Sequence, residues 1–221
     1  TTTTTHAIGN YTANGNYPIS LVANNTYGCT DTARDVFNVY PTPVVNFTPS
    51  GILGCEPYAV TFSNETQDGN SYSWIFTDGS TIVTDSTPVH VFQNFGTYGA
   101  TLIATSFATC ADTLTKNNLI TVNPSPTSDF SYNQLYSEGI PNGTIQFLNA
   151  SVGATNYIWN FGDGAGTNTE THPEHQYPGV DTYQVTLISE NQYHCTDTIV
   201  KPVEVDYFQG LFVPNAFVPN S

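Results

Sequence analysis

The chain has 221 residues, of which 18 are acidic and only three are basic (Arg34, Lys116 and Lys201), so its formal net charge is −15. Nucleic acid is excluded as a partner, because a phosphate backbone needs a basic footprint that three scattered cations cannot supply. An anionic membrane surface is disfavoured likewise, and no apolar run reaches the length of about 18 residues that a membrane span needs. The many Thr, Tyr, Val and Phe residues, with 17 Gly and 14 Pro, favour strands and turns.

The strongest signal is an internal repeat, which we use to take the elements in chain order. An offset of 85 (159 − 74) carries Trp74 onto Trp159 without a gap. The same offset carries Phe62, Phe76, Asp78, Gly79, His90, Tyr98, Leu102 and Cys110 onto Phe147, Phe161, Asp163, Gly164, His175, Tyr183, Leu187 and Cys195. A third, partial copy lies upstream at an offset of 81 (98 − 17), where Tyr17, Leu21, Cys29, Asp31 and Thr32 match Tyr98, Leu102, Cys110, Asp112 and Thr113.

The partial copy at residues 1–40 predicts a strand with one apolar face, formed by Tyr17, Ile19, Leu21 and Ala23. No second sheet in this chain is available to cover that face. Two explanations are open: the rest of the copy is missing from this chain, or a neighbouring chain completes the sandwich by strand addition, as filaments can do.

The two full copies, at residues 41–123 and 124–206, show the alternation of apolar and polar residues that strands with one buried face require. About seven short strands in each, separated by Gly, Asn, Asp and Pro turns, predict an all-β fold of tandem Ig-like β-sandwich modules. Trp74 and Trp159 are expected in the cores. Tyr98 and Tyr183 stand where a sixth strand would begin and suit the tyrosine-corner role.

At these residues the chain resembles a known family. The run Tyr-Ile-Trp-Asn-Phe-Gly-Asp-Gly at 157–164, His-Pro-Glu-His-Gln-Tyr at 172–177 and Asp-Thr-Tyr-Gln-Val-Thr-Leu at 181–187 resemble the signature of the polycystic kidney disease (PKD) module. The earlier copy is looser, with Ile75 and Thr77 where the family favours Asp and Gly. The resemblance implies spacers or binding domains of surface proteins.

The segment 207–221 is expected to be a linker and the first strand of a further domain. Its residues 210–221, Gly-Leu-Phe-Val-Pro-Asn-Ala-Phe-Val-Pro-Asn-Ser, resemble the opening of the gliding-motility-associated C-terminal domain, the type B sorting signal of type IX secretion. Ser221 stands where that family has Gly. The resemblance implies a Bacteroidota-like source, export by the type IX machinery, and the cell surface or medium as destination. The alternative is a proline-punctuated edge strand or linker.

Four cysteines in an exported β-protein suggest disulfides. Cys29, Cys110 and Cys195 each lie twelve residues after a corner tyrosine (195 − 183), in the expected loop before the last strand, whereas Cys55 precedes a second strand. In an Ig-like topology these two sites lie at opposite ends of one sandwich, roughly 20 Å apart, and a disulfide needs Cα atoms within about 7 Å. We therefore predict that Cys55 pairs with Cys195 across the module junction; the alternative is Cys55 with Cys110.

Each loop cysteine is followed by an Asp-Thr-apolar triplet, and the threonines are Thr32, Thr113 and Thr198. The triplets resemble the O-glycosylation sequon of Bacteroidota. The alternative is a turn Asp followed by a β-branched strand residue, which alone explains the recurrence.

Metal and cofactor signals are weak. His90 and His175 occupy matching strand positions and are expected to be packed or hydrogen-bonded, and no Cys or His pair has zinc-site spacing. No cofactor is expected, with Ca²⁺ on the oxygen-rich loop of Asn64, Glu65 and Asp68 as the exception to consider.

No enzyme is expected, because the chain has no Gly-x-Ser-x-Gly elbow, phosphate-cradling loop or dinucleotide fingerprint. We expect a non-catalytic extracellular stalk or adhesin region, part of a longer exported protein whose export signal lies upstream. A role as a filament component is a further expectation. Its partners would be neighbouring modules or copies of the same protein, and surface polysaccharide. The alternative is that the chain forms spacer or carbohydrate-orienting modules of a secreted polysaccharide hydrolase.

Overall fold

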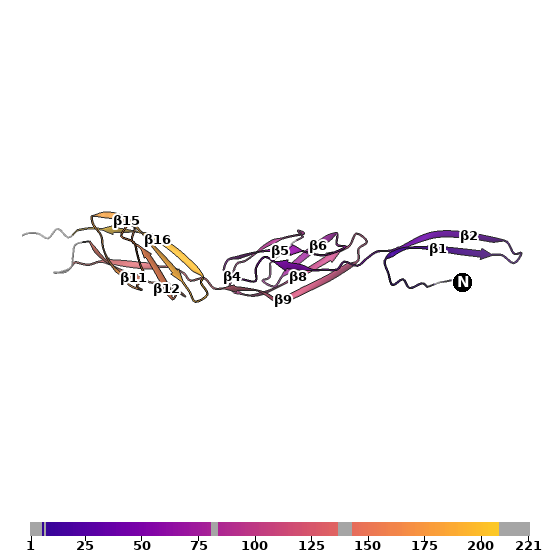
Figure 1. The fold of residues 1–221 in the computed structure, drawn as a ribbon, viewed down its shortest axis with the longest axis horizontal. Helices are drawn as coiled ribbons and strands as arrows, with labels where there is room; N and C mark the ends of the chain where they lie inside the picture. Colours follow the sequence, from indigo (N-terminus) through magenta and orange to yellow (C-terminus); the bar gives the residue numbers. More distant parts are fainter. Residues whose placement is uncertain (1–5, 7, 81–83, 137–142, 208–221) are drawn as a thin grey trace, which may run out of the picture. The chain divides into compact units, whose positions relative to one another are not determined.

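The computed structural model describes residues 6, 8–80, 84–136 and 143–207. All regular elements in these ranges are strands. The chain divides into two compact units, Thr1–Val122 and Asn123–Ser221. The first unit contains a hairpin and a complete sandwich, and the second contains another sandwich (Figure 1). Each of these three parts is described by itself.

The hairpin consists of β1 (Gly15–Asn24) and β2 (Thr30–Val39), which form a two-stranded antiparallel sheet. Its register places Tyr17 opposite Phe37 and Leu21 opposite Ala33. Tyr11, which precedes the hairpin, packs against the rings of Tyr17 and Phe37 at centroid distances of 4.3 and 5.5 Å. Most of the hairpin is exposed.

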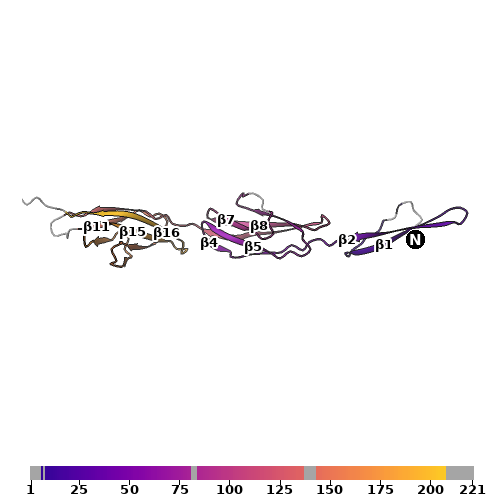
Figure 2. The same ribbon diagram turned by 90° about the horizontal axis from the view of Figure 1, so that it is seen from above.

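The first sandwich has seven strands in two sheets. Figure 2 labels four of these strands, β4, β5, β7 and β8. One sheet has the order β3-β5-β7, and the other β4-β9-β8-β6. The strands are β3 (Phe47–Pro49), β4 (Leu53–Cys55), β5 (Tyr58–Asn64), β6 (Ser71–Phe76), β7 (Val89–Phe92), β8 (Gly96–Thr105) and β9 (Ala111–Asn123). Alternate residues of both sheets meet in a core centred on Phe47, Phe62, Trp74, Phe92 and Leu102, all fully buried.

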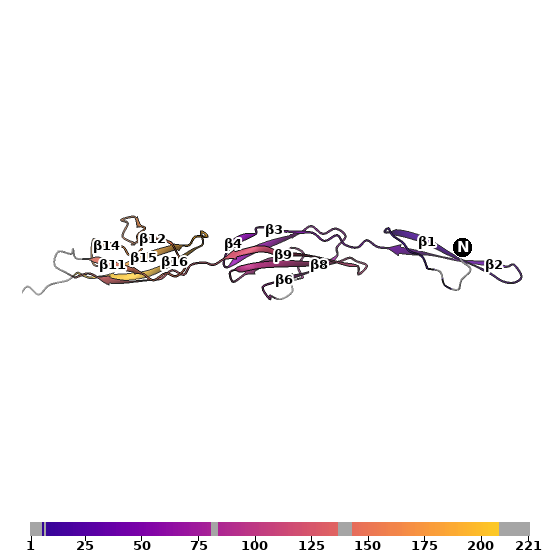
Figure 3. The same cartoon turned by 90° about the horizontal axis from the view of Figure 1, so that it is seen from below.

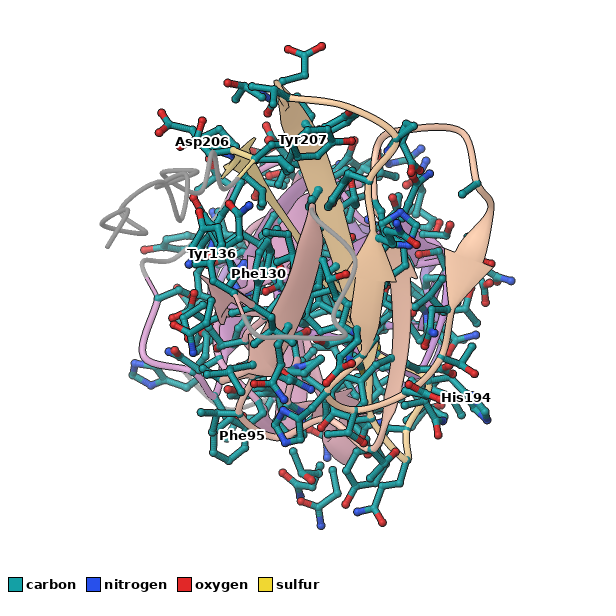
Figure 4. All side chains as sticks on the ribbon, turned by 90° about the vertical axis from the view of Figure 1, so that its left-hand side faces the viewer. Phe95, Phe130, Tyr136, His194, Asp206 and Tyr207 are labelled. Atoms are coloured by element: carbon teal, nitrogen blue, oxygen red, sulfur yellow. The ribbon has the colours of Figure 1, made fainter. Side chains whose placement is uncertain are left out.

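The second sandwich repeats this plan, except that the fourth strand of its larger sheet is added beside the tryptophan strand and not beside the last strand (Figure 3). One sheet has the order β10-β11-β14, and the other β13-β12-β15-β16. The strands are β10 (Phe130–Gln134), β11 (Thr144–Asn149), β12 (Asn156–Asn160), β13 (Thr167–Asn168), β14 (Glu174–Gln176), β15 (Asp181–Glu190) and β16 (Thr196–Val205). Its core contains Phe147, Trp159 and Leu187, together with Phe130, which Figure 4 labels in a view along the sandwich.

The predicted fold class, all-β with tandem Ig-like sandwiches, is confirmed. The side chains that alternation placed inward, such as Phe62, Trp74, Phe147 and Trp159, are buried. The core also includes residues that the alternation argument did not identify. These are Val45, Phe47, Phe92, Ala104, Ile120, Val122, Phe130, Tyr177, Val203 and Val205.

Candidate functional site

The first sandwich contains a His–Asp pair at its surface. Nε2 of His90, on β7, lies 2.7 Å from Oδ2 of Asp78, and the imidazole stacks on the Phe76 ring at 3.9 Å. The other oxygen of Asp78 accepts a hydrogen bond from the backbone N–H of Ser80. Burial acts to raise the pKa of Asp78, but the hydrogen bonds from Ser80 and His90 outweigh it, so the pKa lies below its ordinary value.

The second sandwich has the same arrangement. Nε2 of His175, on β14, lies 2.7 Å from Oδ2 of Asp163, and the imidazole stacks on Phe161 at 4.0 Å. Tyr177 meets the imidazole edge-on, and its hydroxyl donates to the Phe161 carbonyl at 3.1 Å. Burial acts to raise the pKa of Asp163, and hydrogen bonds from His175 and the Ala165 N–H lower it further than burial raises it.

A His–carboxylate pair also occurs in catalytic triads, where the second imidazole nitrogen faces a nucleophile. Here the Nε2 atom already binds the carboxylate, and the imidazole is stacked on Phe161 and packed at nearly a right angle against Tyr177. The repeated pair of His175 and Asp163 therefore fastens the turn after β12 to strand β14. We assign both His–Asp pairs a structural role.

The two core tryptophans make equivalent hydrogen bonds to the connection that follows their strand. Trp74 and Trp159 are fully buried, and each indole N–H donates to a backbone carbonyl eleven residues later, that of Asp85 at 3.0 Å and that of Glu170 at 2.9 Å. A buried indole N–H without such a partner would be costly. The long connection after the tryptophan strand is thus tied to the core.

The corner tyrosines also act alike. The hydroxyl of Tyr98 donates to the carbonyl of Asn94 at 2.8 Å, and that of Tyr183 to Gly179 at 3.2 Å. This bond to the backbone four residues upstream is the geometry of a tyrosine corner. It fixes the entry of the chain into β8 and β15.

Sequence reasoning missed the role of the two lysines, which occupy repeat positions (201 − 116 is again 85). Lys116 Nζ donates to the carbonyl of Phe47 at 2.6 Å and lies 4.6 Å from the centre of that ring. Lys201 does the same with Phe130, at 2.7 and 5.2 Å, and also pairs with Asp129 at 2.5 Å. The hydrogen bond from Lys201 lowers the pKa of Asp129. Both cations therefore secure the first strand of a sandwich to its last.

Cys55 and Cys195 are disulfide-bonded, whereas Cys29 and Cys110 carry free thiols. In the first sandwich, the Thr121 N–H donates to the carbonyl of Ile52, which places Cys55 close to the end of β9. Cys110 precedes the start of β9, eleven residues from Thr121 (121 − 110), or about 36 Å along a strand. The alternative pairing of Cys55 with Cys110 has no support in this geometry.

In the second sandwich, Cys195 lies in the loop between β15 and β16. The Oδ1 atom of Asn191 accepts the Cys195 N–H at 3.1 Å, and the Nδ2 atom of Asn191 donates to the Pro124 carbonyl at 2.7 Å. Cys195 is thus beside the residue where the chain enters this sandwich, as Cys55 is beside the residues where it leaves the first. The bond between Cys55 and Cys195 stays a prediction, and the position of each cysteine within its own module supports it.

The three threonines of the sequon-like triplets, Thr32, Thr113 and Thr198, are exposed at matching positions on β2, β9 and β16. In the third triplet, the Asp197 carboxylate accepts the Ser128 N–H at 2.6 Å, so this Asp has a structural role of its own. Thr198 itself faces solvent, so its hydroxyl is accessible to modification.

The loop considered for Ca²⁺ uses its oxygens internally. Glu65 accepts hydrogen bonds from Asn46 Nδ2 at 2.7 Å and Thr48 Oγ1 at 2.8 Å, and Asn64 Oδ1 accepts the Thr66 N–H at 3.0 Å. Among the residues that the structure describes, no three His, Cys, Asp or Glu side chains gather in a way that could hold a metal ion. No helix in those ranges is long and apolar enough to cross a membrane.

The second sandwich also carries an open groove on its β12–β15 sheet. Its lining includes Thr155, Tyr157, Ile158, Thr171 and Glu190. Residues 210–221, which resemble the sorting signal, lie outside the described residues.

Comparison with known proteins identifies the repeats. The sequence profile of the PKD domain matches residues 40–122 and 123–206, more than half of the chain. Among solved structures, the PKD1 domain from Vibrio cholerae metalloprotease PrtV is similar, with 26% identity and a TM-score of 0.32 over 37% of this chain and 98% of that domain. The PKD1 domain of Vibrio anguillarum Epp is 21% identical, with a TM-score of 0.33 over 38% of this chain and 95% of that domain.

A further similar structure comes from work on host cell surface retention of a 1.5-MDa bacterial ice-binding adhesin. It is 10% identical, with a TM-score of 0.37 over 87% of this chain and 74% of that one. The family assignment rests on the profile match rather than on these partial structural likenesses.

Proposed function

Because this chain belongs to the PKD domain family, we propose that it is a non-catalytic extracellular region that acts as the stalk of a cell-surface or secreted adhesin. One observation carries the proposal. The polar side chains that recur in both modules, namely the His–Asp pair, the indole N–H, the corner tyrosine and the lysine, all make hydrogen bonds within their own sandwich. They strengthen each module and do not converge on a shared reaction centre.

Pulling on single molecules tests the stalk proposal. Under reducing conditions, each module should unfold in one step and lengthen the chain by about 280 Å, since about 83 residues extend by roughly 3.4 Å each. A stalk that bears load should resist until a defined unfolding force. Gradual extension without separate steps would contradict the proposal.

The second candidate, spacer modules of a polysaccharide hydrolase, is favoured by the groove on the second sandwich. Its mixture of threonine hydroxyls, Tyr157 and Glu190 offers both hydrogen-bonding and apolar contact to a sugar. A glycan array distinguishes the two candidates, because binding that is lost in Glu190→Gln would assign a carbohydrate-orienting role. An array without binding favours the stalk.

Two untested features belong to the same proposal: export by the type IX machinery of a Bacteroidota-like bacterium, and O-glycosylation of Thr32, Thr113 and Thr198. No cofactor is proposed, and Ca²⁺ on the loop of Asn64, Glu65 and Asp68 stays the exception to be tested. Intact-mass measurement on native material should show glycan masses above the polypeptide mass, and the bare polypeptide mass would remove the glycosylation proposal. Melting curves with Ca²⁺ and with chelator test the loop, since a bound ion raises the melting temperature.

A further inference from the structure

The hairpin β1–β2 is the same structural unit as β15–β16. The two match without a gap at an offset of 166 (183 − 17), which carries Tyr17 onto Tyr183 and Cys29 onto Cys195. The hydroxyl of Tyr17 donates to the carbonyl four residues upstream, as that of Tyr183 does. The turn after β1 has the same hydrogen bonds as the turn after β15: the side chain of Asn25 accepts the N–H of Cys29, as that of Asn191 accepts the N–H of Cys195.

The match continues upstream of the hairpin. The same offset carries Tyr11 onto Tyr177, the residue that follows β14 in the second sandwich. Tyr11 packs on Tyr17 at 4.3 Å, and Tyr177 packs on Tyr183 at 4.2 Å. The segment before β1 therefore makes the same tyrosine–tyrosine contact as the segment before β15.

The two units differ in what covers them. In the complete sandwich, the inner-face residues of β15 and β16 are fully buried, whereas their counterparts in the hairpin are exposed. The pairs are Val185 and Ile19 (0% and 46% exposed), Leu187 and Leu21 (0% and 70%), and Val203 and Phe37 (0% and 51%). These hairpin residues, with Ile8 and Tyr11, line an open apolar concavity.

The second sandwich shows which residues cover such a face. Phe130 on β10 and Phe147 on β11 pack over it in the core. On the open edge, β12 pairs with β15 and places Trp159 opposite Leu187. The equivalent edge of β1 has no partner strand among the described residues, and β1 and β2 form a sheet of two strands (Figure 3). An isolated two-stranded hairpin is marginally stable in water.

We propose that the inner face of β1–β2 is the docking surface for strands equivalent to β10, β11 and β12, supplied from the N-terminal side of the same polypeptide. These strands would complete a third PKD sandwich. In both complete modules the covering strands precede the equivalent hairpin in the same chain. The repeat match that runs from Tyr11 through β2 gives β1–β2 the same place in its module, so the covering strands belong to the same chain and not to a second copy. In a second copy, β10, β11 and β12 already cover their own β15 and β16.

One position of the docking surface differs in charge from its counterpart in the second sandwich. Asp35 lies opposite Ile19, where the complete sandwich has Lys201 opposite Val185. Lys201 binds the carbonyl of the first strand and Asp129. With a carboxylate at this place, the covering strand should not carry an acidic residue in the position of Asp129, because two carboxylates would repel each other.

A fusion tests the proposal. A second copy of residues 124–170, which contains the covering strands, is joined directly to Thr5. Thr5 is the counterpart of Thr171, so the join keeps the offset of 166 (171 − 5). Asp35→Lys is included because the donor strands normally meet Lys201 at that place. Hydrogen exchange in β1 and β2 should become at least about 100-fold slower than in the chain of residues 1–221 carrying only Asp35→Lys, because covered strands open far less often. The fusion should remain monomeric. Slow exchange in the two complete modules reports that the rest of the chain is folded.

Two further variants sharpen the result. Phe147→Asp in the added donor copy should abolish the protection, and Leu21→Asp in the unfused chain should leave both complete modules unchanged. Exchange in the hairpin that is equally fast with and without the donor overturns the proposal. So does concentration-dependent self-association of the unfused chain that protects β1 and β2 and is lost in Leu21→Asp, because a second copy would then be the occupant.

Discussion

At the residue scale, the stability of each sandwich depends on a few polar side chains that work inside an aromatic core. Asp163 illustrates the electrostatics. Its side chain is almost fully buried, and its pKa is lowered because hydrogen bonds to His175 and Ala165 favour the charged carboxylate more than burial disfavours it. A carboxyl group with a lowered pKa in the folded state stabilises the fold above its unfolded pKa of about 3.9. That contribution is lost as the pH falls through the folded pKa.

We therefore predict that Asp163→Asn weakens the second sandwich at neutral pH and reduces the dependence of its stability on pH below about 4. Urea denaturation at several pH values measures this in a Trp74→Phe background, where Trp159 is the remaining tryptophan. Asp206→Asn, at an exposed carboxylate after β16, is the matched control. An unchanged pH dependence in Asp163→Asn would contradict the assigned role.

Lys201 provides a second prediction at this scale. Lys201→Met keeps the aliphatic stem but removes the hydrogen bonds to Phe130 and Asp129, so the second sandwich should lose about 1–3 kcal/mol. Lys116→Met should have the same effect on the first sandwich. Arg34→Met serves as the control for loss of charge, because Arg34 is exposed on the hairpin. Equal stability of all three variants would mean that the lysine contacts contribute nothing measurable.

At the element scale, the backbone that follows the tryptophan strand lies close to the corner-tyrosine strand in both modules. The glycine that permits this close approach is in the first of these segments in one module and in the other segment in the other module. In the second sandwich, Gly162 has a φ of +82°, and an added Cβ would lie 2.5 Å from the Gln184 carbonyl oxygen. In the first, the matching positions hold Thr77 and Gly99, and the Thr77 hydroxyl accepts the Gly99 N–H. The departure of Thr77 from the family pattern is thus accompanied by a glycine in the facing strand.

Gly162→Ala should therefore destabilise the second sandwich by about 2 kcal/mol or more, since it adds a backbone clash to the cost of a left-handed conformation. Gly164→Ala is the matched control. Gly164 also has a positive φ, of +85°, but nothing lies within 4 Å of an added Cβ, so only about 1–2 kcal/mol is expected. Urea denaturation of both variants measures the difference, and equal losses would exclude the clash.

At the scale of the whole molecule, the cysteines determine how the chain would carry force. If Cys55 and Cys195 are bonded to each other, tension between the termini passes through the disulfide and bypasses residues 56–194. The predicted staple would then protect most of both sandwiches from mechanical unfolding, in addition to limiting bending between them. A stalk gains from this because its modules stay folded under load.

Peptide mapping without reduction should give a linked peptide containing Cys55 and Cys195, with Cys29 and Cys110 open to alkylation. In pulling experiments, the extension from residues 56–194, about 470 Å at roughly 3.4 Å per residue, should appear only after reduction or in Cys195→Ser. A linked peptide of Cys55 and Cys110, or full extension of the oxidised chain, would contradict the pairing.

Much of this protein could be predicted from its sequence. The offset that carries Trp74 onto Trp159, the alternating apolar residues around them and the turn residues between strands determined an all-β tandem fold, because strand periodicity and turn chemistry are local properties of the chain. The exposed face of Ile19 and Leu21 was also predictable, since alternation shows which side of a strand is apolar.

Only the tertiary structure decided which groups meet across the sandwich. Lys201 looks like an isolated surface cation in the sequence, and its contacts with Phe130 and Asp129 join residues about seventy positions apart. The hydrogen bond from Trp159 to Glu170, the His175–Asp163 pair and the glycine exchange between positions 99 and 162 depend likewise on how two strands are superposed. Such contacts follow from the packing of the sheets, which no local pattern specifies.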